Sequence, residues 1–394
     1  MPETARSGAS LAALALQAPP MPVASTSSAP PSPVSPPSPA APPSHAVNKP
    51  RKPKPRIPLS GTPSEILSQN NTAAPQFWVD KTVRLAGKHW NDFYRNHGKT
   101  IARREDEDEA VRDRAGRDAD GAKVQFFKER HWTWREWREL EELGAGSKGK
   151  GKGKSVLETG CGTGAFIYPL LERYPDARFV AFDFAAKAVE LTKSHPAHTP
   201  TRVHVFQHDL TAPPSRPSLT SQLLAVPPEF GEPVQQFDIV SSIFVLSALA
   251  PRNHAKAVQT LISLLAPGGS LLFRDYALHD EAQLRFHALP SASYATVPSL
   301  LSPQTASPAT SSSPSLDEDT ASFELNKPWY KRGDQTMTYF FTPAELQTLV
   351  DAACTELGVT VEGGVGVVER KMENRGEGWA CTRRFVHGSW KRVA

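Results

Sequence analysis

Three glycines stand at alternate positions, Gly160, Gly162 and Gly164, directly after a short apolar run at 156–157. The next apolar run ends at an acid, Asp183. In an α/β fold, glycines at such a turn let the backbone approach a ligand, and the following helix offers free N–H groups. An acid at the end of the next strand can accept hydrogen bonds from ribose hydroxyls. The pattern predicts a site for an adenosine-bearing cofactor.

Two classes of cofactor fit the glycine loop taken alone, because Ala165 also permits a loose variant of the dinucleotide-binding motif. Two further acids favour S-adenosylmethionine. Glu158 lies just before the loop, and Asp209 follows the third apolar run, where a carboxylate can recognise the adenine amino group. Asp183 could instead cap the next helix, and Asp209 could be a turn residue. Their positions at the ends of successive strands favour a ligand site.

The elements that position these residues alternate between strand and helix. Apolar runs predict strands at 155–159, 178–183, 202–206, 237–243, 270–275, 358–368 and 379–390. Helices are predicted at 164–174, 185–194, 253–265 and 343–356, and the Pro-Gly-Gly sequence at 267–269 predicts a turn before the fifth strand. This alternation implies an α/β fold with a mainly parallel sheet and right-handed crossovers.

Composition divides the chain of 394 residues into six parts. Pro-rich and Ser-rich segments bury too little apolar surface to offset their chain entropy and are predicted to be disordered. The parts are a tail at 1–75, an aromatic and basic helical module at 76–147, a Lys/Gly spacer at 148–154, an α/β core at 155–288, a disordered insertion at 289–326 and the rest of the core at 327–394.

Three local features add to this division. The basic cluster at 49–56 is either a solvated linker or a tether for nucleic acid. Charges of both signs at 102–122 predict an exposed loop or a solvated helix. Thr133 and Glu136 have the spacing of a capping box, which predicts that a helix begins at Thr133.

Charge and cysteine usage limit the environment and partners of the chain. The formal net charge is only +4. Cys161, Cys354 and Cys381 have neither disulfide nor metal-ligand spacing, so we expect a reducing compartment and no metal site. No apolar run has membrane-spanning length, so no membrane association is expected. The expected location is the cytoplasm, and the nucleus or mitochondrion would also fit.

Two motifs that the sequence lacks narrow the range of possible methyl acceptors. The segment at 241–248 lacks the Asn or Asp, Pro-Pro and aromatic residues that many methyltransferases of exocyclic base amines carry after the fourth strand. No cysteine follows a proline, which argues against covalent attack on a pyrimidine ring.

The chain resembles the methyltransferase-like family that forms 3-methylcytidine at position 32 of the tRNA anticodon loop. The resemblance covers most of 77–394 apart from the insertions. It rests on the segments at 89–94, 126–132, 160–164, 183–184, 208–210, 243–248, 273–276, 283–286, 330–334 and 339–342. The most distinctive are Phe127-Lys128-Glu129-Arg130-His131-Trp132 and the pair Arg274-Asp275-Tyr276 and Leu284-Arg285-Phe286.

This resemblance implies a class I, Rossmann-like methyltransferase with a seven-stranded, mostly parallel sheet, an antiparallel last strand and an N-terminal helical module. It implies S-adenosylmethionine as cofactor and the tRNA anticodon stem-loop as substrate. Cofactor contacts are expected from Trp90, Tyr94, Gly160, Gly162, Asp183, Asp209, Leu210 and Ile243. The chain departs from the family at Ala165, where Asn is usual, and at 335–337, where Gly-Thr-Arg is usual.

Cytosine N3 carries a lone pair in the ring plane and needs no base before it attacks a methyl group. A carboxylate near the developing positive charge would help, and Asp275, at the end of the fifth strand, is the candidate catalytic residue. Its alternative role is a structural partner of an arginine. The residues expected along the RNA path, any of which could be a solvated surface charge, are Arg130, His131, Arg285, Lys331 and Arg332.

The sequence alone leaves three alternatives open. The enzyme could methylate a protein or a small molecule, or the chain could be a non-catalytic RNA-binding adaptor on the same fold. A partner such as an aminoacyl-tRNA synthetase could be required for tRNA specificity.

Overall fold

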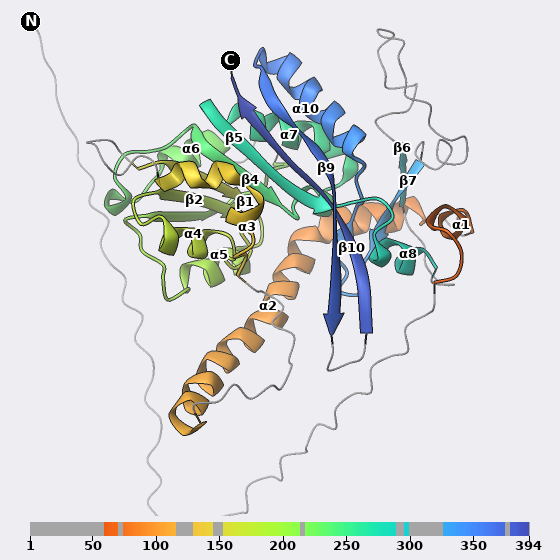
Figure 1. The fold of residues 1–394 in the computed structure, drawn as a ribbon, viewed down its shortest axis with the longest axis horizontal. Coiled ribbons are helices and arrows are strands. Elements are labelled where there is room, and N and C mark those ends of the chain that lie inside the picture. The colour runs from red at the N-terminus through yellow and green to blue at the C-terminus, as the bar shows by residue number, and fades with distance from the viewer. Residues whose placement is uncertain are drawn as a thin grey trace, which may run out of the picture. The chain divides into compact units, whose positions relative to one another are not determined.

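A seven-stranded sheet forms the centre of the fold, with the strand order β3-β2-β1-β4-β5-β10-β9 (Figure 1). The first five strands pair in parallel, and β10 is antiparallel to both β5 and β9. The last strand is therefore the antiparallel one, which confirms the expected class I topology. The strands are β1 (Ser155–Thr159), β2 (Arg178–Asp183), β3 (Val203–Gln207), β4 (Phe237–Ile243), β5 (Leu265–Tyr276), β9 (Val361–Asn374) and β10 (Trp379–Arg392).

The computed structural model describes residues 59–69, 74–115, 129–144, 153–212, 217–288, 295–298, 326–374 and 379–393, and these lie in one compact unit that spans Lys54–Ala394. The tail up to residue 58, its basic cluster at 49–56, residues 116–128, most of the spacer at 148–154 and most of the insertion at 289–326 lie outside the described residues.

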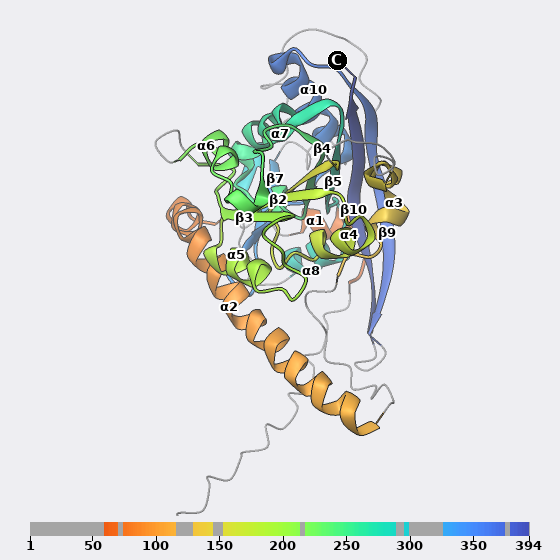
Figure 2. The same cartoon turned by 90° about the vertical axis from the view of Figure 1, so that its left-hand side faces the viewer.

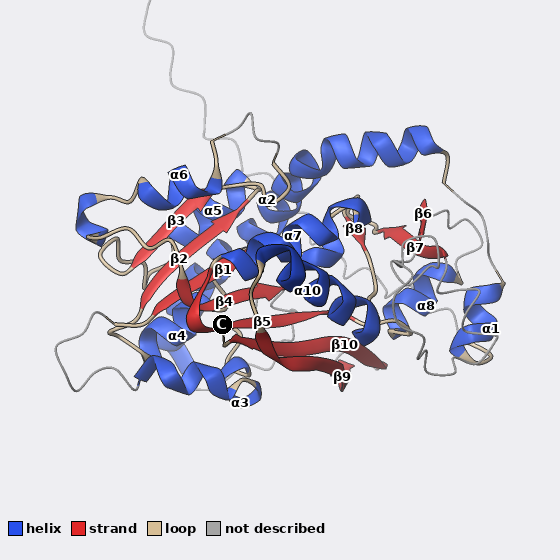
Figure 3. Cartoon of the chain, turned by 90° about the horizontal axis from the view of Figure 1, so that it is seen from above, coloured by secondary structure: helices blue, strands red, loops and turns tan. Residues whose placement is uncertain are grey.

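Helices cover both faces of the sheet, as Figure 3 shows. On one face, α6 (Leu219–Leu224), α7 (His254–Ser263) and α10 (Pro343–Leu357) enclose a core that includes Leu157, Val240 and Phe273. On the other, α3 (Thr133–Glu136), α4 (Ile167–Arg173), α5 (Ala186–Lys193) and the 3-10 helix η1 (Arg138–Gly144) pack on Val156 and Phe179. Both faces of β1, β2 and β4 are buried, so these central strands are mostly apolar, whereas the edge strand β9 is exposed and carries charged residues.

Helix α2 (Gln76–Ala115) belongs to the N-terminal module and runs past α5 (Figure 2). Its backbone stays helical through residue 115, so the helical alternative predicted for 102–122 holds as far as the structure describes it. No helix in the described part of the chain is long and apolar enough to cross a membrane.

Smaller elements lie beside the carboxyl ends of the strands. Helix α1 (Pro63–Ser68) packs on α8 (Glu281–His287) through Ile66, Leu67 and Leu284. A second sheet contains β6 (Ala295–Pro298), β7 (Asn326–Lys331) and β8 (Met337–Thr338). The short 3-10 helices η3 (Leu246–Ala248) and η4 (Pro251–Asn253) follow β4, whereas η2 (Pro228–Phe230) precedes β4 and lies near the start of β2.

The structure differs from the sequence predictions at three points. Helix α3 begins at Thr133 as predicted, but the capping box is absent, because Thr133 Oγ1 donates to the Arg130 carbonyl and the Glu136 carboxylate contacts Arg274 and Arg370 instead. Strand β5 begins at Leu265 and contains the predicted turn as a register shift against β4. Within 289–326, residues Ala295–Pro298 pair antiparallel with β7, because β-branched Thr296 and Val297 favour a strand.

Candidate functional site

The glycine loop between β1 and α4 is a turn in the left-handed backbone region. Gly160 and Gly162 have φ values of 61° and 59°, which residues with a side chain rarely adopt. A Cβ on Gly160 would lie 2.6 Å from a Val245 methyl carbon, and one on Gly162 would lie 3.1 Å from the Tyr94 hydroxyl oxygen. The loop therefore has no room for side chains where it faces these two residues.

Asp183 fixes this loop to the end of β2. Its Oδ2 accepts a hydrogen bond from the Gly162 N–H at 3.0 Å, and its Oδ1 accepts one from the Ala185 N–H at 2.9 Å. Burial raises the pKa of Asp183 to about 6, although both hydrogen bonds lower it. Each carboxylate oxygen can accept two hydrogen bonds, so Asp183 keeps the capacity to bind a ribose hydroxyl. That role stays a prediction.

Glu158 lies on β1 beneath the loop and is fully buried. Its Oε1 is 3.4 Å from Arg130 Nη1, while its Oε2 has no hydrogen-bond partner among the described residues. The Arg130 N–H donates to the Ala165 carbonyl at 2.8 Å. Burial raises the pKa of Glu158 to about 8, against the opposing charge of Arg130. The structure thus places Arg130 against the glycine loop.

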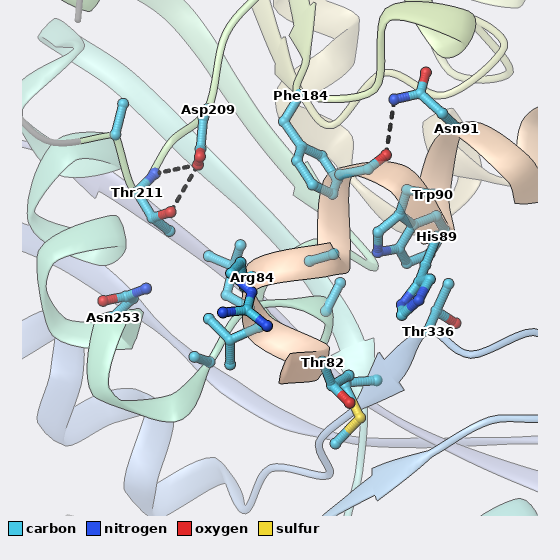
Figure 4. A pocket seen from close by; sticks show the side chains of 18 of the residues that line it. Thr82, Arg84, His89, Trp90, Asn91, Phe184, Asp209, Thr211, Asn253 and Thr336 are labelled. Atoms are coloured by element: carbon cyan, nitrogen blue, oxygen red, sulfur yellow. Dashed lines mark hydrogen bonds between the residues drawn. The ribbon is translucent and has the colours of Figure 1, made fainter. Parts of the chain in front are cut away.

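A cavity of about 500 Å³ opens beside the loop that follows β3 (Figure 4). Asp209 lines it, and Asp209 Oδ1 accepts hydrogen bonds from the Thr211 N–H and hydroxyl at 2.9 and 2.7 Å. Phe184 and Trp90 line the same cavity, and the Phe184 ring points into it in Figure 4. Aromatic walls with a carboxylate at one edge fit an adenine ring and its amino group. The residues present therefore fit an adenosine-bearing cofactor.

Of the eight predicted cofactor residues, only Trp90 and Asp209 line this cavity. Leu210 and Ile243 are buried nearby. Leu210, after β3, is 8% exposed, and Ile243, at the end of β4, is 2% exposed. They belong to the core clusters on opposite faces of the sheet. Their contact with the cofactor stays a prediction.

Helix α2 packs its aromatic residues against the start of α5. Tyr94 and Phe93 contact Ala185 and Ala188, and Trp90 packs against this group. Burial raises the pKa of the Tyr94 phenol well above its ordinary value, and the charge of Asp183 adds to this effect. Tyr94 therefore stays protonated beside the loop.

Asn91 of α2 completes this contact and was missed by the sequence analysis. Its Oδ1 accepts a hydrogen bond from the Lys187 N–H at 2.9 Å, and its Nδ2 donates to the Gly87 carbonyl at 2.7 Å. The cap position of α5 is Ala185, which has no side-chain acceptor. The cap comes from a residue 96 positions earlier, so local spacing could not reveal it.

We expect Asn91→Ala to weaken cofactor binding by about fivefold, the effect of losing one helix cap, because α2 loses its tie to α5. Asn91→Asp is the matched control, since it keeps the acceptor and its charge suits a helix N-terminus. Isothermal titration with S-adenosylhomocysteine measures both. Equal affinities of wild type and Asn91→Ala would contradict this role.

Comparisons with known proteins agree with this geometry. A family described as "Methyltransferase domain" matches residues 108–307. The human tRNA N(3)-cytidine methyltransferase METTL6 is 31% identical over 84% of this chain and 89% of its own. The chain belongs to the tRNA N(3)-cytidine methyltransferase family. The trm141 enzyme of Schizosaccharomyces pombe, a tRNA N(3)-methylcytidine methyltransferase, is 28% identical over 80% of this chain and 96% of its own.

Solved structures give only a distant likeness. An S-adenosylmethionine-dependent methyltransferase from Methanosarcina mazei has a TM-score of 0.35 and 13% identity, and covers 66% of this chain and 99% of that one. A likeness at this level adds nothing to the family assignment.

Asp275, the predicted catalytic residue, lies at the end of β5 and is fully buried. Its Oδ2 accepts a hydrogen bond from the Ser247 N–H at 2.9 Å, and its Oδ1 accepts one from the Tyr276 N–H at 2.8 Å. Burial raises the pKa of Asp275 to about 6, although its bonds to Ser247 lower it. Arg274 pairs with Glu136 instead, so it is not the structural partner of Asp275.

An aromatic group adjoins Asp275, and sequence reasoning missed its central member. Phe244 has a φ of 62°, rare for a residue with a side chain. Its ring stacks on Tyr276 with centroids 5.0 Å apart, and Phe385 meets it edge-on at 5.5 Å. Strained backbone of this kind gathers at functional sites. The end of β4 therefore presents Phe244 beside Asp275.

The other residues expected along the RNA path lie in different settings. His131 pairs with Glu129 at 2.7 Å, and Arg285 pairs with Glu281 one turn earlier on α8. The Arg332 guanidinium lies 5.3 Å from the centre of the Tyr276 ring, beside the aromatic group. Lys331 is exposed and has no ion pair among the described residues. Contact with RNA stays a prediction for all of them.

The family departure at 335–337 lies against the cavity. Met337 lines it and is 8% exposed, packed into the core beside Trp329. Gln335 has a φ of 73° at the position where the family usually has glycine. A methionine thus forms an apolar wall here.

Proposed function

We propose that this enzyme, which methylates N3 of cytidine in tRNA with S-adenosylmethionine, acts at position 32 of the anticodon loop. Similarity to the family over most of the chain carries the assignment. The pairing of a cofactor-sized cavity with a carboxylate and strained aromatic residue at neighbouring strand ends supports it.

The chemistry requires positioning more than proton transfer. S-adenosylmethionine supplies an electrophilic methyl group, and N3 of cytosine supplies the electron pair. The new N–C bond forms as the S–C bond breaks, and the base becomes cationic without losing a proton. Phe244 and Tyr276 can stack on the base, and an aromatic face attracts the product cation. Asp275 adds negative charge close by, in a buried setting where charge acts strongly.

A buried methylation site favours a target base in a single-stranded loop over one in a duplex. A base must leave its stack to reach a buried site, and this costs less in a single-stranded loop. Lys331 ends β7 and Arg332 follows it beside the aromatic group, where both side chains can contact the phosphate backbone. We propose Lys331, Arg332, His131 and Arg285 as RNA contacts, and Arg130 as a residue of the cofactor loop that also borders the base site.

One experiment tests the proposal. Recombinant protein is incubated with labelled S-adenosylmethionine and total tRNA, and the methylated nucleoside is identified and mapped by mass spectrometry. We expect 3-methylcytidine at position 32. Label in another nucleoside, or its absence even with cell extract added, would reject the proposal.

Two further parts of the proposal concern the cellular compartment and a protein partner. We propose that the enzyme acts in a reducing compartment, the cytoplasm, since all three cysteines are free thiols in the structure. We also propose that an aminoacyl-tRNA synthetase contributes to tRNA selection. A pull-down from extract with and without tRNA, followed by methylation assays with the added partner, tests this element.

Proton release should accompany cofactor binding. With a pKa raised to about 8, Glu158 is mainly protonated at pH 7, and a bound sulfonium and ammonium favour its ionised form. We therefore expect affinity to rise from pH 6 to pH 8.5. The binding enthalpy at pH 7 should depend on the ionisation enthalpy of the buffer.

The Glu158→Gln variant is the control for proton release, because it keeps the shape but cannot ionise. Its binding enthalpy should be the same in all buffers. Because burial raises the pKa of Glu158 to about 8, the folded state loses stability as pH rises from the ordinary carboxyl pKa toward that raised value, so this variant should also melt higher than wild type at pH 8.5. A buffer dependence that survives in Glu158→Gln would assign the proton elsewhere.

RNA binding should depend on Lys331 in a salt-sensitive way. Removing one phosphate contact lowers the slope of log K against log salt by about 0.7 to 0.9. We expect this change in Lys331→Ala, measured by fluorescence anisotropy with an anticodon stem-loop. Lys193→Ala, at the end of α5, is the matched control. Identical slopes in wild type and Lys331→Ala would remove Lys331 from the contact surface.

A further inference from the structure

Arg130 contacts both the cofactor loop and the aromatic group at the end of β4. Its backbone N–H donates to the Ala165 carbonyl at 2.8 Å, which fixes the main chain at the glycine loop. Its side chain reaches Glu158, with 3.4 Å between Nη1 and Oε1. The same guanidinium has its central carbon 5.7 Å from the centre of the Phe244 ring. One side chain therefore lies between a carboxyl of the cofactor site and the ring proposed to bind the base.

Both contacts of the Arg130 side chain are loose. A charge-assisted hydrogen bond between arginine and a carboxylate is about 2.7–2.9 Å long, so the 3.4 Å separation from Glu158 is long. The distance to Phe244 is near the limit of about 6 Å for a cation–π interaction. Among the described residues, Glu158 is the only ion-pair partner of Arg130. A change at either contact can therefore shift the guanidinium toward the other.

A guanidinium beside Phe244 opposes the reaction in two ways. The Phe244 ring is only partly buried and already stacks on Tyr276, so a base that stacks on it competes with Arg130 for the remaining space. Methylation at N3 also makes the base cationic, and a nearby positive charge repels that product. Arg130 at this position therefore disfavours both binding of the base and methyl transfer to it.

The contact with Glu158 depends on the charge of its carboxyl. Burial raises the pKa of Glu158 to about 8, so the group is mainly protonated at pH 7 in the free protein. Of the charged side chains that act on it, Arg130 favours the ionised form and Asp183 opposes it. A bound cofactor brings an ammonium group, and the methyl donor also a sulfonium, both of which favour ionisation. An ionised Glu158 attracts Arg130 with a full opposite charge.

We propose that Arg130 couples the two sites by moving between Phe244 and Glu158. In the free protein it screens the Phe244 ring. Cofactor binding draws the guanidinium onto Glu158 and opens the ring to the target base, so the cofactor binds first and the loaded protein binds RNA more tightly. Arg130 is thus a positioning residue. This inference rests on the proposed function, because it takes RNA as the substrate whose base stacks on Phe244.

The affinity of an anticodon stem-loop with and without saturating S-adenosylhomocysteine measures this coupling. Fluorescence anisotropy should show about tenfold tighter binding to the loaded wild-type protein, within the usual range for coupled sites. Coupling is reciprocal, so calorimetry should show that the stem-loop tightens binding of S-adenosylhomocysteine by the same factor. Equal stem-loop affinities of the free and the loaded protein would overturn the proposal.

Two variants test whether Arg130 and Glu158 carry the coupling. Arg130→Gln should bind the stem-loop with less than about a twofold difference between its free and loaded forms, because a neutral side chain does not respond to the charge of Glu158. A purely structural role would weaken both affinities and leave their ratio unchanged. Glu158→Gln cannot ionise and should lose the coupling as well. Tenfold coupling that survives in either variant would overturn the proposal.

Two further variants are controls. Arg135→Gln removes an exposed arginine from the same segment and should keep the coupling. Its loss there would assign the effect to net charge and overturn the role of Arg130. Val245→Ala tests the other contact between the two sites, since the Val245 methyl groups lie against Gly160. This variant should keep the coupling, whereas loss in Val245→Ala with retention in Arg130→Gln would assign the coupling to packing instead.

The same stem-loop separates this inference from the proposed function. If it is methylated but its affinity does not depend on the cofactor, this inference alone fails. If it is not methylated, the proposed function fails whatever the coupling.

Discussion

We expect Asp275→Ala to bind S-adenosylhomocysteine with nearly wild-type affinity and to transfer the methyl group about 100-fold more slowly or worse, the effect of removing a group that stabilises developing charge. The carboxylate holds the N–H groups of Ser247 and Tyr276, so its loss also misplaces the Tyr276 ring that stacks on Phe244. Single-turnover assays with saturating tRNA and calorimetry separate turnover from binding.

The pH profile distinguishes a charge effect from a structural one. Because burial raises the pKa of Asp275 to about 6, the wild-type rate should be constant above that pH and should fall as the carboxyl becomes protonated below it. Asp275→Asn keeps the shape and should lose this acid limb. Glu142→Gln, which neutralises an exposed acid paired with Lys391 away from the site, is the matched control. Equal losses of cofactor affinity and turnover in Asp275→Ala would reject a role in methyl transfer.

The second large effect is expected at Asp183. Asp183→Ala should weaken cofactor binding by about 100-fold or more, because two hydrogen bonds to a charged group are lost, each contributing about 1.5–3 kcal/mol. The variant leaves the N–H groups of Gly162 and Ala185 unpaired and frees the glycine loop. Calorimetry with S-adenosylhomocysteine measures the loss, and circular dichroism checks the fold.

Asp238→Ala is the control for loss of an acid that anchors the sheet. Asp238 accepts hydrogen bonds from Ser155 and Lys154 at the opposite end of β1. That variant should lower the melting temperature without changing cofactor affinity at a temperature where it is folded. If Asp183→Ala bound the cofactor as tightly as wild type, Asp183 would be neither a ribose ligand nor an anchor of the loop.

Local sequence patterns correctly predicted the helices and strands that are stabilised by contacts between residues close together in the chain. The predicted helix at 343–356 formed as α10, and its start has a local cause, since Thr342 and Glu345 are bonded to each other's backbone in a capping box. Strands β1, β2 and β4 have the predicted bounds, because continuous apolar runs fit a sheet buried on both faces. The same capping spacing failed at Thr133, since Glu136 finds two arginines from β5 and β9. A buried charge pair outweighs a local cap at a short helix.

The sequence by itself determined the α/β topology, the glycine loop and the acids at the ends of β2 and β3, because these depend on the order of short segments along the chain. Only the tertiary structure showed that Asn91 caps a helix 96 positions away, that Arg130 reaches Glu158 and that Phe244 stacks beside Asp275. Each of these contacts joins elements that lie far apart in the sequence. Tertiary packing determined these contacts, because it pairs buried polar groups with partners that are near in space rather than near in sequence.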